Sequence, residues 1–200
     1  MTLVTLVEAP WEGALAYKVD RSEDKRRAAY KIDIRGPWDD EPDKIQWVDD
    51  TSDLDCLMVR NHFGNWCGYV GVPVGHPAYG VDYDQIDVSV HGGLTYGAPC
   101  AADEADGAPS GGVCHVPLDG RPHEVWWQGF DCGHGGDFAP GMHSMEMRVM
   151  PDLLVKYGND AAYDHEDAMK GDWMRQKYRT MAYVRAEVSG LASQLAALPR

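Results

Sequence analysis

One stretch of the sequence combines imidazole and carboxylate side chains with a glycine-rich backbone. Asp131, His134 and Asp137 stand three residues apart, directly after the apolar run at residues 125–130. The glycines between them permit backbone conformations that other residues avoid, so a curled loop can bring the three side chains to one point. Imidazole and carboxylate together suit Zn²⁺, Mn²⁺ or Fe²⁺, and Mg²⁺ where carboxylates dominate. The pattern indicates a metal or catalytic site; the alternative is that both aspartates cap turns and His134 is merely exposed.

A second apolar run, residues 86–90, ends in His91 and a pair of glycines. Glycines at such a position allow a ligand to approach the backbone closely. A simple turn with a hydrogen-bonded histidine is the alternative interpretation. We therefore predict a divalent metal site (Zn, Mn or Mg) in which His91, Asp131, His134 and Asp137 are both ligands and catalytic residues. The prediction depends on the two loops meeting in space.

Residues near these motifs are candidates for contact with a small ligand. The chain has seven Trp and ten Tyr against three Phe, and the flat faces of Trp and Tyr stack on bases or sugar rings. Trp126 and Trp127 should point to opposite faces of one strand, so at most one lines the site. For His76, in a loop rich in Gly and Pro, a structural role is the favoured interpretation. The candidate ligand contacts are Arg60, Asn61, Tyr69, His76, Thr95, Tyr96 and Trp127.

The elements that position these residues are predicted to form an α+β fold, a mostly antiparallel mixed sheet with C-terminal helices packed on it. Alternation predicts strands at residues 3–7, 14–19, 30–34, 44–48, 54–60, 86–90 and 125–130, and a bent or edge strand at 68–74. We expect a single domain over residues 1–200, with mainly strands and loops in 1–150 and a helical part in 151–200.

The C-terminal part shows helical spacing. Short helices are expected at 152–158 and 160–170, and a final helix is expected to begin at Asp172 as its N-cap. Its apolar face is formed by Met181, Val184, Val188, Leu191 and Leu195. A polar stripe on the same helix, formed by Arg179, Tyr183 and Glu187, is expected to be solvated.

The composition disfavours several classes of partner. With 32 acidic and 18 basic residues the formal net charge is −14, which disfavours binding to duplex nucleic acid and to anionic membranes but is compatible with divalent cations. No apolar run is long enough to span a membrane and no signal-peptide pattern is present, so we expect a cytoplasmic protein. The five cysteines include no CxxC pair, so we expect reduced thiols and no four-cysteine zinc site, although Cys114-His115 can supply one more ligand.

Four motifs together resemble a family of proteins found in tailed bacteriophages and in some bacteria. They are residues 67–77 (CGYVGVPVGHP), residues 91–96 (HGGLTY), residues 126–137 (which contain GFDxxHxGD), and the set Tyr178-Arg179, Tyr183-Val184 and Glu187. The resemblance covers about residues 54–195. It implies a phage or prophage protein made in the host cytoplasm, and it implies no particular activity.

Three functions fit these features. The favoured one is a metal-dependent hydrolase acting on a small nucleotide or phosphodiester-type substrate, by analogy a phage accessory protein that counters host defence signalling. The first alternative is a non-catalytic protein that sequesters a small nucleotide. The second is an acidic virion or host-interaction protein in which the glycine-rich loops are incidental. The sequence contains no Walker loop, GxGxxG, HExxH or GxSxG motif that would favour another class of enzyme.

Overall fold

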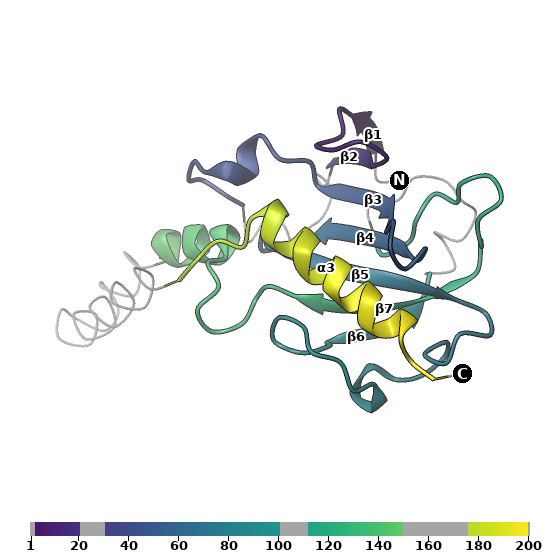
Figure 1. Cartoon of the computed structure of the whole chain (residues 1–200). Helices are drawn as coiled ribbons and strands as arrows, with labels where there is room; N and C mark the ends of the chain where they lie inside the picture. Colours follow the sequence, from purple (N-terminus) through teal and green to yellow (C-terminus); the bar gives the residue numbers. More distant parts are fainter. Residues whose placement is uncertain (1–2, 21–30, 101–111, 150–175, 200) are drawn as a thin grey trace.

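The computed structural model contains a seven-stranded sheet with a long helix lying across it (Figure 1). It describes residues 3–20, 31–100, 112–149 and 176–199. In sheet order the strands are β1 (Leu3–Val7), β2 (Leu15–Asp20), β3 (Lys44–Val48), β4 (Asp55–Arg60), β5 (Trp66–Pro73), β7 (Val125–Asp131) and β6 (Tyr96–Pro99). All neighbouring pairs are antiparallel.

The helix α3 (Met181–Ala196) packs on β5 and β4. Another helix spans residues 140–149, and two short 3-10 turns, η1 (Pro37–Asp39) and η2 (Tyr83–Gln85), lie in connections. The predicted α+β fold with a C-terminal helix on the sheet is confirmed, although the described sheet is antiparallel throughout rather than mixed. The helices predicted at 152–158 and 160–170 lie outside the described residues. None of the described helices is long and apolar enough to cross a bilayer.

The sheet is covered on both faces. Met58 and Val70 belong to the cluster beneath α3, whereas Leu57 and Trp127 belong to a separate cluster on the other face. Successive residues of a strand point to opposite faces, which explains the alternation between the two clusters. Half-buried Tyr96, Cys100 and Val113 pack against the second cluster, on the face that α3 leaves open.

Two segments with strand-like alternation form no strand in the structure. Of the strand predicted at 30–34, Tyr30 lies outside the described residues. Residues 31–34 lie along the helix at 140–149, where Ser144 Oγ accepts from Asp33 N and Arg148 Nη1 donates to the Lys31 carbonyl at 2.7 Å. Residues 86–90 lie along α3, and Gln194 binds both backbone groups of Ser89, at 2.7 Å and 2.8 Å. The alternation correctly marks one apolar side, but helix side chains supply the hydrogen bonds that a neighbouring strand would otherwise supply.

Strand β5 corrects the prediction of a bent or edge strand at 68–74, because it lies inside the sheet between β4 and β7. Its glycines make room for packing. A Cβ on Gly68 would stand 2.5 Å from Val188 of α3 and 2.6 Å from the ring of Phe130, and one on Gly71 would stand 3.1 Å from the Trp127 ring. Glycine here permits close approach of the layers and does not bend the strand.

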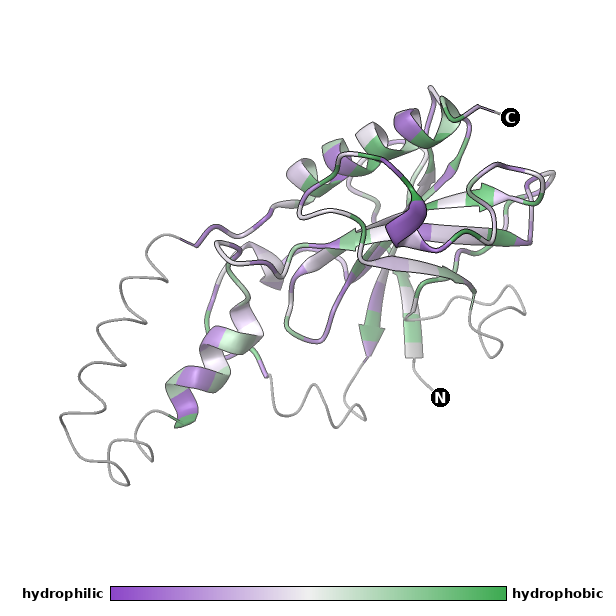
Figure 2. Cartoon of the chain, turned by 90° about the horizontal axis from the view of Figure 1, so that it is seen from below, coloured by the Kyte–Doolittle hydropathy of each residue, from purple (hydrophilic) through white to green (hydrophobic). Residues whose placement is uncertain are grey.

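The helix α3 begins after Thr180, whose side chain accepts a hydrogen bond from the Tyr183 amide at 3.3 Å. Residues 176–180 are not helical, so the predicted start at Asp172, which itself lies outside the described residues, is wrong. Figure 2 shows α3 as a layer over the sheet, with hydrophilic and hydrophobic residues alternating along it. The predicted apolar face is confirmed, since Met181 is partly buried and the other members are fully buried; the buried residues are Val184, Val188, Leu191, Ala192 and Leu195.

Gly68→Ala is expected to lower the free energy of unfolding by about 1–3 kcal/mol, because the added methyl group overpacks the layer between β5 and α3. Chemical denaturation of the variant measures this loss. Gly190→Ala is the matched control: it lies within α3 with no atom within 4 Å of its added Cβ, so it should be neutral or stabilising by about 0.5–1 kcal/mol. Equal effects of the two substitutions would contradict the close-approach explanation.

Candidate metal centre

The two glycine-rich loops meet beside the first half of α3, as their composition predicted. His91 Nε2 lies 2.8 Å from Asp137 Oδ2, and the rings of His91 and His134 are 5.5 Å apart between centroids. One ligand atom from each of His91, His134 and Asp137 lies within 4.8 Å of the other two. These three predicted ligands therefore form a compact group of two imidazoles and one carboxylate.

Glycine is required where the loops touch. A Cβ on Gly92 would stand 2.1 Å from the His134 ring, and Gly92 has a φ of +68°. Both features favour glycine, because residues with a side chain rarely adopt a positive φ and the His134 ring leaves no room for a Cβ atom. The amide of His91 donates to Glu187 Oε2 at 2.9 Å, which anchors the loop to α3.

The carboxylate of Asp137 is the centre of the group and its side chain is only 1% exposed. Oδ2 accepts from His91 and, at 3.0 Å, from the His134 amide, while Oδ1 accepts from Arg179 Nε at 2.6 Å. Burial opposes ionisation of Asp137, but hydrogen bonds from Arg179, His91 and the His134 amide outweigh it and lower its pKa. Asp137 is thus an ionised carboxylate that is almost completely buried.

The predicted polar stripe faces this group, which corrects the prediction that it is solvated; Tyr183 and Glu187 lie in α3, whereas Arg179 lies just before the helix. Tyr183 Oη lies 3.0 Å from His91 Nδ1, Glu187 binds the His91 amide, and Arg179 binds Asp137. The Arg179 guanidinium also lies over the Tyr183 ring, 4.9 Å from its centroid. The spacing of the stripe was visible in the sequence, but the sequence gave no sign of which surface it meets.

Asp131 does not join the group, which corrects its assignment as a ligand of the same ion. It pairs in register with Cys67, a member of the cluster on the face opposite α3. Oδ2 accepts from Thr95 Oγ1 at 3.0 Å and Oδ1 accepts from the Gly133 amide at 2.8 Å. Because β7 continues through Asp131, the pleat of the strand directs this side chain to the other face.

Comparison with known proteins gave no match to a family model, a curated protein or a solved structure. The function of the chain must therefore be argued from the chemistry of its side chains.

Arg60 is buried, with its side chain only 1% exposed, and its guanidinium is engaged by the fold. Nη2 donates to Glu41 Oε2 at 2.6 Å, and Nη1 donates to the Gly64 carbonyl and to Tyr178 Oη, both at 2.7 Å. This corrects the prediction that Arg60 contacts a ligand, because its guanidinium binds the Glu41 carboxylate of the chain itself. Tyr178 precedes Arg179, so this ion pair supports the backbone that carries Arg179 to Asp137.

The aromatic candidates belong to the core rather than to an open site. Trp127 is fully buried in the second cluster, whereas Trp126 packs with the residues beneath α3, so their predicted placement on opposite faces is confirmed. Tyr69 is buried and meets Tyr96 edge to face at 5.2 Å. Neither Trp127 nor Tyr69 therefore exposes a ring face on which a ligand can stack.

The remaining polar candidates organise turns. Asn61 Oδ1 accepts from the amides of Phe63 and Asn65, at 2.9 Å and 3.1 Å. His76 Nδ1 accepts from the Ala78 amide at 3.1 Å, which matches the structural role favoured for it. Thr95 is exposed and binds Asp131 at the edge of the sheet.

Two cysteines form a disulfide, which corrects the expectation of reduced thiols throughout. Cys100 and Cys114 are joined, with their Cα atoms 4.9 Å apart, whereas Cys56, Cys67 and Cys132 are free and buried. The two partners are separated by 14 positions, and their spacing in the sequence did not predict the pairing.

Proposed function

We propose that the chain is a metal-dependent hydrolase in which His91, His134 and Asp137 hold one divalent ion. The observation that carries the proposal is the mutual approach of their ligand atoms, all within 4.8 Å. Ligands of a tetrahedral zinc ion lie about 3.3 Å from one another, given metal–ligand distances of about 2.0–2.1 Å. The separations from Asp137 Oδ2 are 2.8 Å to His91 Nε2 and 3.8 Å to His134 Nδ1, so small shifts suffice.

Two further features support an ion at this place. His134 Nδ1 is buried and has no hydrogen-bond partner within the described ranges, which is compatible with its binding a metal ion. Tyr183 on His91 and Arg179 on Asp137 are outer partners of the kind that orient metal ligands. An ion between His91 and Asp137 would replace their shared proton, so metal affinity should rise with pH.

Three protein ligands leave a coordination position for water, which is typical of catalytic rather than structural zinc sites. A divalent ion there would lower the pKa of bound water and polarise a phosphoryl or carbonyl oxygen. Arg179, whose side chain is 26% exposed, adds a positive charge beside the group. That charge favours an anionic substrate on an otherwise acidic protein, and we propose a small nucleotide or other phosphodiester. The resemblance to phage proteins suggests that this substrate is a nucleotide signal of the host.

The first test is metal content. The chain with its disulfide intact should bind about one equivalent of Zn²⁺ or Mn²⁺ after dialysis, measured by elemental analysis. His134→Ala should weaken this binding by more than about 100-fold, because loss of a ligand exceeds the 10–100-fold cost of losing an outer partner. His76→Ala is the matched control, since it removes an imidazole that lies in a separate turn.

Hydrolysis is then measured with bis(p-nitrophenyl) phosphate and a set of cyclic nucleotides as probes, with and without added metal. Turnover that requires metal and is lost in His134→Ala supports the proposal. Absence of bound metal in the wild-type chain rejects it. Tight binding of a nucleotide that is recovered intact would instead indicate the sequestering protein.

A metal-free acid–base site is the second candidate. Asp137 and Tyr183 flank the two ring nitrogens of His91 at 2.8 Å and 3.0 Å, an arrangement that orients an imidazole for proton transfer. In that case turnover would survive a chelator, and His134→Ala would retain most of it. The two candidates therefore predict opposite responses of the same variant.

A further inference from the structure

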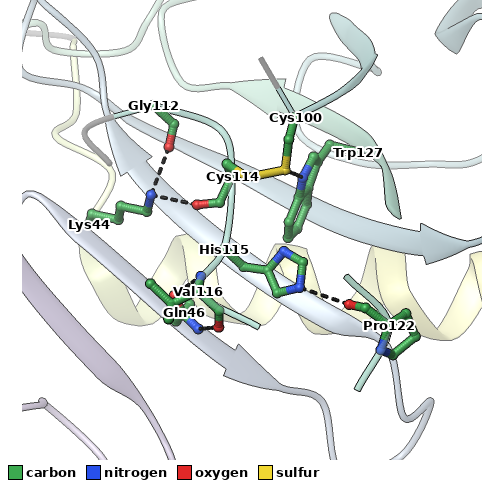
Figure 3. The surroundings of a disulfide bond; sticks show 9 residues. All are labelled: Lys44, Gln46, Cys100, Gly112, Cys114, His115, Val116, Pro122 and Trp127. Atoms are coloured by element: carbon green, nitrogen blue, oxygen red, sulfur yellow. Dashed lines mark hydrogen bonds between the residues drawn. A yellow bond between two sulfur atoms is a disulfide. The ribbon is translucent and has the colours of Figure 1, made fainter. Parts of the chain in front are cut away.

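A second group of ligand-type side chains lies on the other face of the sheet, around the disulfide (Figure 3). The sulfur atoms of Cys100 and Cys114 and one nitrogen of His115 lie within 4.8 Å of one another. Cys114 and His115 are almost fully buried. The group borders a cavity of about 230 Å³ that His123 and Glu124 also line. Nothing in the proposed hydrolase site uses these residues.

The hydrogen bonds of His115 decide which of its nitrogens is available. Nε2 lies 3.1 Å from the carbonyl oxygen of Pro122, and because a carbonyl can only accept, Nε2 carries the proton. The neutral ring therefore has its lone pair on Nδ1. That atom is buried and has no partner among the residues that the structure describes. A histidine that donates one N–H to a backbone carbonyl and keeps the other nitrogen free has the arrangement of a metal ligand.

Buried side chains of β3 hold the segment that carries these ligands. Lys44 Nζ donates to the carbonyl oxygens of Cys114 and Gly112, at 2.5 Å and 3.0 Å. Gln46 binds Val116 through both its amide nitrogen and its oxygen, at 2.8 Å and 2.9 Å. The backbone on both sides of His115 is thus fixed to the sheet, and a site built on it would be preorganised.

The sulfur of Cys100 is held from the other side. Trp127 Nε1 donates to it at 3.5 Å, and the ring of Trp127 packs edge to face against His115 at 5.4 Å. A fully buried indole N–H that points at sulfur suits a thiolate as well as a disulfide, because it stabilises negative charge on that atom. The hydrogen bond from Trp127 to the Cys100 sulfur can therefore form in both the disulfide and the thiolate state.

We propose that Cys100, Cys114 and His115 form a redox-controlled site for a soft divalent cation, zinc in particular, of which the disulfide is the oxidised, metal-free form. Two thiolates and an imidazole are ligands that zinc prefers, and His123 or Glu124 from the same cavity can complete four-coordination. This site is separate from the proposed hydrolase centre, since it lies on the face of the sheet opposite α3.

Conversion of the disulfide into the zinc site takes two steps. A dithiol reductant transfers two electrons and two protons to the Cys100–Cys114 bond, which breaks into two thiols while the reductant closes its own disulfide. Zn²⁺ then displaces both thiol protons to solvent and binds the two thiolates. Either link joins Cys100, the residue after β6, to Cys114.

The test uses the full chain, reduced with a dithiol, desalted without oxygen and titrated with Co²⁺ as a coloured substitute for Zn²⁺. We expect one equivalent with sulfur-to-cobalt charge-transfer absorption, which added Zn²⁺ displaces. X-ray absorption of the zinc form should show sulfur neighbours at about 2.3 Å. The oxidised chain should show neither signal. His115→Ala should weaken Co²⁺ binding at least tenfold, whereas His62→Ala, a histidine of a different turn, should not.

Two variants separate this site from other sources of the signal. Cys100→Ser/Cys114→Ser retains Cys56, Cys67 and Cys132, so its loss of the absorption assigns the sulfur ligands to the pair. His134→Ala must retain the absorption, which keeps this result independent of the proposed hydrolase. Absence of sulfur ligation in the reduced wild-type chain, or its persistence in the double serine variant, overturns the proposal without reference to any variant's activity.

Discussion

Replacing Arg60 by methionine is expected to lower the free energy of unfolding by about 3–5 kcal/mol, because it leaves the Glu41 carboxylate buried without its ion pair. The two side chains are 1% and 9% exposed, so water cannot compensate for the lost partner. Trp66 Nε1 and Tyr178 Oη also donate to Glu41, at 3.1 Å and 2.6 Å, but neither carries a charge. Urea denaturation followed by Trp fluorescence gives the loss directly.

The matched experiment is a double-mutant cycle. Glu41→Leu/Arg60→Met removes both charges and should be less destabilised than the sum of the two single variants, because neither member of the pair is left buried without the other. Additive losses would show that Glu41 and Arg60 do not interact in solution. Since Tyr178, the residue before Arg179, binds both members of this pair, the single variant should also loosen the position of Arg179 at the proposed metal centre.

Asp137→Asn is expected to abolish metal binding at the proposed hydrolase centre, with affinity lowered by more than about 100-fold. The amide has a single acceptor oxygen, and so cannot accept from both His91 and Arg179, which approach different oxygens of the carboxylate. Turnover of any substrate found for the chain should fall with it. Isothermal titration with Zn²⁺ measures the affinity.

The same substitution has a stability effect whose size depends on pH. The pKa of Asp137 is lowered in the folded chain, so its ionised form stabilises the fold above the ordinary Asp pKa of about 3.9. This contribution is lost as pH falls through the lowered folded value. The difference in unfolding free energy between wild type and Asp137→Asn should therefore be largest near neutral pH and shrink below about pH 4.

Asp131→Asn is the control for this pair of measurements. It changes the same atoms in the same glycine-rich stretch, but Asp131 lies at the end of β7 and binds Thr95. We expect zinc affinity within about threefold of wild type, the spread common to indirect effects. A loss equal to that of Asp137→Asn would mean that the ion is held by the arrangement first predicted and not by the observed group.

The local patterns of the sequence were sufficient for the class of fold and for the types of ligand. Alternation located β1, β2, β3, β4 and β7, and steps of three and four located the buried side of α3. The glycine-flanked histidines and aspartates marked the loops that do converge. These features were readable because alternation, helical spacing and glycine conformation are properties of a few neighbouring residues.

The tertiary structure decided which other element each apolar or polar face of a helix or strand contacts. Residues 86–90 have the pattern of a strand, yet α3 and not a strand supplies their hydrogen bonds. Arg60 ends a strand, and its pattern alone is compatible with exposure to solvent. In the structure its guanidinium is buried against the Glu41 carboxylate. Tyr183 lies on a stripe that would be solvated on an isolated helix and instead binds His91.

What the sequence by itself determined about this protein is therefore its elements and its chemistry: an acidic α+β chain with imidazole and carboxylate groups on glycine-rich loops. Only the tertiary structure placed Asp137 rather than Asp131 beside His91 and His134, and joined Cys100 to Cys114. Both choices depend on contacts between residues far apart in the chain. A periodic pattern records which side of an element is apolar, but it contains no information on which other element will cover that side.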